Sequence, residues 1–107
     1  MPAIALDAER VAAIAKALAH PVRVQIVELL AGQSACRGAE VFGELPLAQS
    51  TVSEHLRVLR EAGVLSASHV GTSSVYCLHP EMLDTFATVL SSLADTARTC
   101  QKGECGR

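Results

Sequence analysis

The chain has 107 residues, of which 50% are hydrophobic and 19% are charged, and its formal net charge at pH 7 is −2. This length suits a single domain with one modest core. The charge excludes a general electrostatic attraction to polyanions, so DNA binding would need a local basic patch. The aromatic residues are two Phe and one Tyr, which argues against stacking on single-stranded nucleic acid.

The N-terminal sequence MPAIALDAER has no basic leader, and the longest unbroken apolar run, 11–15, is far shorter than the roughly 20 residues that span a bilayer. We therefore expect a cytoplasmic protein without membrane association. In a chain without a leader, cysteines are expected to serve metal or redox chemistry rather than a disulfide framework. The cysteines are Cys36, Cys77, Cys100 and Cys105.

Two short helices are predicted before residue 33. Asp7 is positioned to cap the first helix, which ends at His20-Pro21. Pro21 suits the first position of the second helix, which stops at Gly32. The polar segment GQSACRG after it is expected to be a loop. The apolar face of the first helix is formed by Val11, Ile14, Ala15 and Leu18.

A helix, a tight turn and a second helix are predicted over 39–62. The first of them, about 39–44, is closed by Leu45-Pro46, because the residue before a proline is pushed out of the helical region. The second, about 49–62, has Gly63 as its stop. Its apolar residues recur at helical spacing and are Val52, Leu56 and Leu59.

From Val64 the pattern changes to the short alternating segments VLSASHV and SSVYCL, which the turn Gly71-Thr72 joins into a two-stranded hairpin. Pro80 then opens a last helix with apolar residues at every third or fourth position, followed by the polar tail TCQKGECGR. We expect residues 1–98 to form one domain and 99–107 to be a flexible tail that contains cysteine.

A helix-turn-helix followed by a β-hairpin is the winged helix-turn-helix arrangement, in which the second helix enters the major groove. The segments ALAHPVRVQIVELL and ELPLAQSTVSEHLRVLREAGVL resemble the ArsR/SmtB family of bacterial metalloregulatory repressors, closest to its arsenic-responsive type, and the element order matches over about 8–98. The resemblance implies a mainly α fold with a β-hairpin, a homodimer built from the first and fifth helices, and double-stranded operator DNA as partner. It implies neither an enzyme nor an obligatory cofactor.

Apolar stripes on the first and last helices exceed what one thin-cored subunit covers, which agrees with a dimer. The stripes are Val11, Ile14 and Leu18 on the first helix and Phe86, Leu90 and Leu93 on the last.

The helix over 49–62 and the hairpin carry the candidate DNA contacts. Short polar side chains crowd the first turn of the helix, where backbone N–H groups favour phosphate, and Gln, Ser and Thr also bond bases. Capping and surface solvation explain the same residues as an alternative. The candidates are Gln49, Ser50, Thr51, Ser53, His55, Arg57, Arg60, His69, Thr72 and Ser73.

Two of these residues have a further interpretation. His55, beside Leu56, is more typical of a packed histidine than of a metal ligand. Ala48 stands where the family usually has a capping Ser, so Ser50 is a candidate for that capping role. Glu54 and Glu61 are unfavourable near phosphates.

The resemblance also implies metal or metalloid sensing, and the family's two common sites are incomplete here. At three of the four positions of the zinc, nickel or cobalt site, the family's hard or borderline ligand is absent. The Cys-x-Cys of arsenic and cadmium sensors is reduced to Cys36 and Gly38, so we expect Cys36 to be a loop residue outside the site. The four positions of the zinc-type site hold Asp84, Phe86, Ala97 and Cys100.

The other three cysteines form the predicted inducer site. Within one subunit, a helix on the order of 27 Å long separates Cys77 from Cys100. The resemblance implies antiparallel last helices in the dimer, which would bring Cys100 and Cys105 of one chain to Cys77 of the other. Three thiolates suit trivalent arsenic or antimony, whose lone pair favours a pyramid, so arsenite, methylarsenite or antimonite is the expected inducer.

Two other functions stay open. Disulfide or persulfide formation among Cys77, Cys100 and Cys105 would make the same DNA-binding body a thiol redox or sulfane-sulfur sensor. A thiol enzyme or metal carrier would need a Cys-x-x-Cys motif or a cysteine activated by a nearby histidine. The sequence contains no such motif and does not place a cysteine and a histidine together as a pair. Cys77 is also typical of a small buried residue in a strand.

Overall fold

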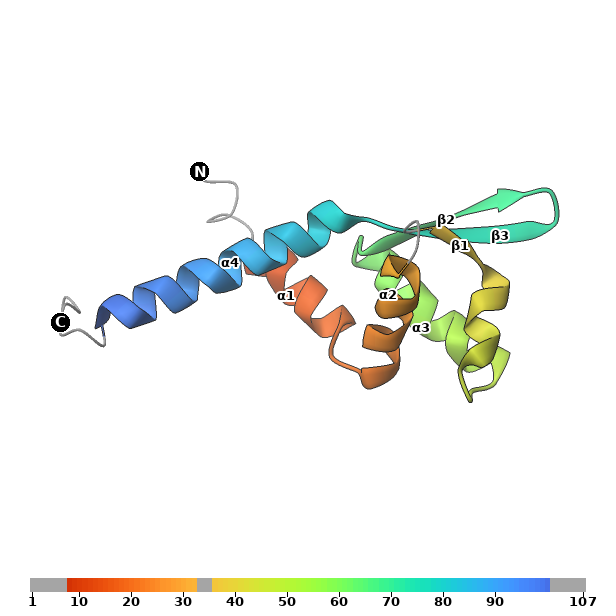
Figure 1. The fold of residues 1–107 in the computed structure, drawn as a ribbon, viewed down its shortest axis with the longest axis horizontal. Helices are drawn as coiled ribbons and strands as arrows, with labels where there is room; N and C mark the ends of the chain where they lie inside the picture. The colour runs from red at the N-terminus through yellow and green to blue at the C-terminus, as the bar shows by residue number, and fades with distance from the viewer. Residues whose placement is uncertain (1–7, 33–35, 101–107) are drawn as a thin grey trace.

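The computed structural model describes residues 8–32 and 36–100 (Figure 1). Asp7, the expected cap of the first helix, lies outside these ranges. The elements in chain order are α1 (Ala8–Ala17), α2 (Pro21–Ala31), β1 (Cys36–Gly38), the 3-10 helix η1 (Ala39–Glu44), α3 (Gln49–Glu61), β2 (Leu65–Val70), β3 (Ser73–Leu78) and α4 (Pro80–Thr99).

The ends of the helices follow local chemistry. His20 caps α2, because its Nδ1 accepts a hydrogen bond from the Val22 backbone N–H over 3.1 Å, and Pro21 occupies the first turn. After α3 the chain passes through Gly63 at φ 81°, a left-handed conformation that favours glycine. The N-cap of α3 is Ala48, with no side-chain hydrogen bond, so a capping role for Ser50 is wrong.

The sheet has three antiparallel strands in the order β1-β3-β2, and not the two that the sequence predicted. The hairpin of β2 and β3 turns at Gly71, φ 65°, as expected. β1 adds to the other edge of β3 and pairs Cys36 with Cys77. Cys36 is therefore a strand residue and not the expected loop residue. The sequence did not predict this strand, because three residues show no periodicity and β1 forms only by pairing with the open edge of β3.

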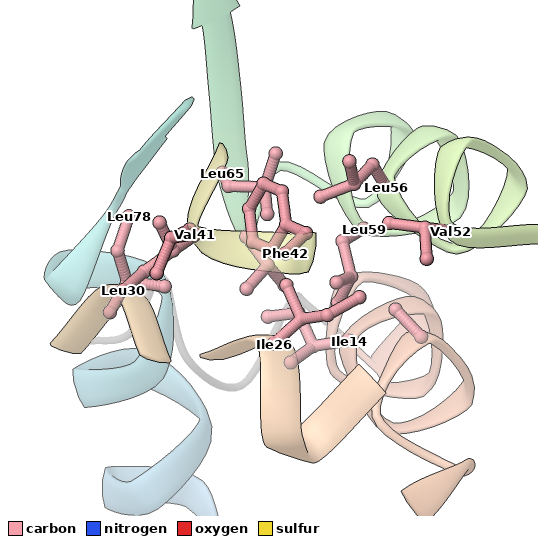
Figure 2. Packing of buried hydrophobic residues seen from close by; sticks show 12 residues of the cluster. Ile14, Ile26, Leu30, Val41, Phe42, Val52, Leu56, Leu59, Leu65 and Leu78 are labelled. Atoms are coloured by element: carbon pink, nitrogen blue, oxygen red, sulfur yellow. The ribbon is translucent and has the colours of Figure 1, made fainter. Parts of the chain in front are cut away.

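The hydrophobic core collects side chains from every described helix except α4 and from the ends of the hairpin strands (Figure 2). Phe42 of η1 lies in the middle of the labelled side chains and meets Tyr76 of β3 edge to face, with ring centroids 5.5 Å apart. Ile14 is fully buried, so its assignment to an exposed dimerisation stripe is wrong. The other large side chains that are fully buried are Ile26, Leu30, Leu59, Val64 and Leu65.

Helix α4 and the hairpin extend in opposite directions from the body formed by α1, α2 and α3 (Figure 1). The first turns of α4 pack against the core through Met82, Leu83 and Phe86. Further along, Leu90 and Leu93 are 49% and 62% exposed. Among the described residues, no helix is both long and apolar enough to cross a membrane. The helix pair η1 and α3, followed by the hairpin, is a winged helix-turn-helix.

Candidate functional site

One face of α3 is buried and the other carries the candidate DNA contacts. Its core side is formed by Val52, His55, Leu56 and Leu59. The exposed side holds the remaining candidates of this helix, Gln49, Ser50, Thr51, Ser53, Arg57 and Arg60. The N-cap residue Ala48 makes no side-chain capping bond, while its carbonyl oxygen accepts from the N–H groups of Thr51 and Val52. The N–H groups of Gln49 and Ser50, which precede these bonds, are the ones suited to a phosphate oxygen.

The hairpin and the start of α3 border one groove of about 470 Å³. Gln49 and Ser53 line it from α3, and Ser74 and Tyr76 line it from β3. At the tip of the hairpin, His69, Thr72 and Ser73 are exposed. The groove therefore joins two of the α3 candidates to strand β3, whereas the hairpin candidates do not line it.

Arg57 is held by its own helix. It hydrogen-bonds Glu54 through Nε over 3.2 Å and through a second nitrogen, and it reaches Glu61 Oε2 over 2.7 Å. The hydrogen bond from Arg57 lowers the pKa of the Glu54 carboxyl, and the two carboxylates raise that of the guanidinium. Because all three side chains are exposed, the pairs are weak and a phosphate oxygen can replace a carboxylate.

His55 does not face the solvent, so its assignment as a DNA contact is wrong. It is 9% exposed, and its Nδ1 accepts a hydrogen bond from Nε of Arg23 on α2 over 3.1 Å. Burial lowers the pKa of His55, and the positive charges of His20 and Arg23 lower it further. The ring of His20 lies 4.5 Å away between centroids.

Arg23 is a structural residue that the sequence analysis missed. Besides His55, its guanidinium donates to the carbonyl oxygens of Lys16 and Ala17, over 3.2 and 3.4 Å, at the end of α1. One side chain thus joins α1, α2 and α3, and fixes α3, the helix with the candidate DNA contacts, against the body. In the sequence, Arg23 is visible only as a basic residue close to Pro21, near the start of a mainly apolar helix.

Cys36 and Cys77 lie directly opposite each other on β1 and β3 and form a disulfide, with their Cα atoms 4.0 Å apart. Cys100, the C-cap of α4, is also disulfide-bonded. Cys105 lies outside the described residues. The 20 residues of α4, about 30 Å in length, separate Cys77 from Cys100 within one chain.

The zinc-type positions of α4 do not form a cluster. Asp84 is exposed, while Phe86 packs against the core. Over residues 8–32 and 36–100, no group of three or more His, Cys, Asp or Glu side chains is placed to hold a metal ion.

The comparisons with known proteins agree with this architecture. Residues 20–67 match the family model described as "Bacterial regulatory protein, arsR family". The HTH-type transcriptional regulator Rv0081 of Mycobacterium tuberculosis is 35% identical over 80 residues, which are 74% of this chain and 70% of that protein. The arsenic resistance transcriptional regulator ArsR1 of Pseudomonas putida is 34% identical over 75% of this chain and 62% of its own length.

Solved structures extend the match to the fold. The crystal structure of Rv0081 superposes with a TM-score of 0.60, at 33% identity, over 84% of this chain and 92% of that chain. The homodimeric winged helix-turn-helix DNA-binding domain Mb0332 of Mycobacterium bovis, solved by NMR, gives a TM-score of 0.66 at 29% identity, over 89% of this chain and 87% of that one. The chain therefore belongs to the ArsR family of bacterial regulatory proteins.

Proposed function

We propose that this chain is a homodimeric transcriptional repressor that leaves its operator when a trivalent arsenic or antimony species binds its cysteine thiolates. The observation that carries the DNA-binding part is the shared groove between the start of α3 and strand β3. It supports a docking mode in which α3 enters the major groove and the hairpin tip follows the backbone beside it. No catalytic role is assigned to any residue.

The unpartnered half of α4 supports the dimer. Leu90 and Leu93 continue the apolar face that Leu83 and Phe86 begin, but they lie beyond the body of the subunit and stay exposed. A second copy that covers this face with its own α4 would give an isologous two-fold interface. The homodimeric state of the related Mb0332 domain agrees with this arrangement. Two α3 helices would then read half-sites about one helical turn apart.

The inducer is proposed from thiol chemistry and from the name of one relative, the arsenic resistance regulator ArsR1. The proposed ligands are Cys77 of one subunit with Cys100 and Cys105 of the other, because α4 is too long for Cys77 and Cys100 to meet in cis. Each As–S bond replaces an As–OH bond and releases water, so arsenic stays trivalent. The metalloid must bind more tightly to the conformation of the dimer that does not fit DNA, with a coupling free energy of roughly 1 to 3 kcal/mol.

A thiol redox repressor is the second candidate function. The disulfide between Cys36 and Cys77 favours it, because two thiols in opposite strand positions are within bonding distance without any movement of the backbone. In that case an oxidant, and not a metalloid, would change the affinity for DNA.

Fluorescence anisotropy of the DNA upstream of the gene separates the two candidates. The protein is kept reduced with a phosphine, because dithiol reductants chelate arsenic themselves. Release by arsenite under these conditions supports the metalloid repressor. Release only by hydrogen peroxide or polysulfide in the absence of reductant supports the redox repressor, and failure to bind the DNA in any state contradicts both.

A further inference from the structure

The pair Cys36 and Cys77 lies within one subunit and is reachable from solvent. Cys36 is exposed on the edge strand β1, and Cys77 is half-buried in the central strand β3. The two residues are directly opposite each other where β1 pairs with β3. The next pair in this register is Arg37 with Tyr76. Neither residue belongs to the buried core, so a reagent can approach the pair from the exposed side at Cys36.

Two thiols at this spacing suit one class of ligand in particular. A monosubstituted trivalent arsenical, R–As(OH)₂, already has one bond to carbon and needs two thiolates to complete its three-coordinate pyramid. Inorganic arsenite has no such bond, so it needs a third thiolate for the same coordination. Cys36 and Cys77 supply two thiols in each subunit without Cys100 or Cys105, so each subunit has a complete site for the first class.

We propose that reduced Cys36 and Cys77 chelate a monosubstituted trivalent arsenical within one subunit, and that the disulfide between them closes this site. The reaction forms two As–S bonds, breaks two As–O bonds and releases two waters, and arsenic stays trivalent. Opening of the disulfide takes two electrons, which two molecules of a cellular thiol supply by exchange as they become a disulfide. A phosphine supplies them by its own oxidation to the phosphine oxide, with the oxygen taken from water.

The inference deepens the proposed function, since it rests on thiol-directed induction and names the residues that accept one part of the expected inducer class, the monosubstituted arsenicals such as methylarsenite. It also gives Cys36 a role that the three-cysteine site does not contain. Cys77 belongs to both sites, so the two ligand classes compete for it.

Phenylarsine oxide is the probe, and the background is the full chain with Cys100→Ser and Cys105→Ser. After reduction with a phosphine, this variant should bind one probe molecule per subunit and lose both titratable thiols, as measured by intact mass and thiol titration. Adding Cys36→Ser or Cys77→Ser should weaken binding roughly 10²-fold or more, because chelation is lost. The same background protein left oxidised should bind none.

Two results would overturn the inference: Cys36→Ser binds the probe as tightly as the background variant, or the reduced background variant binds none although both thiols titrate. Retained binding to operator DNA shows that each variant is folded. Arsenite release of the wild-type protein from DNA is measured in parallel. Its failure contradicts the proposed inducer, whereas the probe experiment decides the Cys36 and Cys77 site separately.

Discussion

Arg23 on α2 donates a hydrogen bond from Nε to Nδ1 of His55 on α3, over 3.1 Å, so α3 is held to the body by a histidine that must be unprotonated at this nitrogen. The protonated ring would lose the acceptor and place a second positive charge beside the guanidinium. Burial, His20 and Arg23 all oppose that charge, and only Glu54 favours it.

This contact predicts a loss of stability in mild acid. The pKa of His55 is lowered in the folded state, while the unfolded chain takes up the proton at about pH 6.5. The unfolded state thus binds more protons below that pH, and the free energy of unfolding should fall as the pH drops through the window between the two pKa values. Urea unfolding between about pH 7.5 and about pH 5.5 measures this slope.

The variant His55→Gln should flatten this slope, because the amide oxygen accepts from Arg23 and does not titrate. His69→Gln is the matched control, since His69 is exposed on the hairpin. An unchanged slope in His55→Gln would show that other groups cause the acid sensitivity.

The second prediction concerns the exposed half of α4. Leu93→Glu places a charge on the face proposed to pair with a second subunit, so the protein should become a monomer at micromolar concentration and lose affinity for the operator. Light scattering measures the mass. Val70→Glu, on the hairpin and 66% exposed, is the control and should leave the dimer intact. A wild-type protein that is monomeric would contradict both the dimer and the shared cysteine site.

The third prediction concerns the outward face of α3. Gln49→Ala and Ser53→Ala should each weaken operator binding by about 1 to 3 kcal/mol if their side chains read bases. Arg57→Ala should also weaken it and reduce the salt dependence by roughly one phosphate contact. Glu54→Gln should strengthen binding, because it frees Arg57 and removes a negative charge. Affinities unchanged in all four variants would place the DNA surface elsewhere.

The helices and the hairpin were predictable because Val52, Leu56 and Leu59 repeat at helical spacing and the strands alternate on both sides of Gly71. β1 was not, because three residues carry no periodicity and the partner Cys77 is 41 positions away. The interpretation of His55 as a packed histidine is confirmed, and its assignment as a DNA contact is wrong, because a polar residue on a helix is not exposed by default. The burial that corrects it depends on Arg23, a contact that only the tertiary fold creates.

The cysteine site between subunits is the central claim, and arsenite release of operator DNA from mixed dimers tests it most directly. Each phosphine-reduced homodimer of Cys77→Ser or Cys100→Ser has no complete site, whereas the heterodimer of the two variants retains one. Cys36→Ser, which lies outside this site, should respond to arsenite as the wild type does.

The heterodimer is purified through two different affinity tags and titrated with arsenite beside both homodimers, with anisotropy of labelled operator DNA as the readout. The account predicts that both homodimers stay bound and that the heterodimer is released in the arsenite range of the wild type. A heterodimer that stays bound like its parents, or homodimers released like the wild type, would contradict the site formed by Cys77 of one subunit and Cys100 and Cys105 of the other.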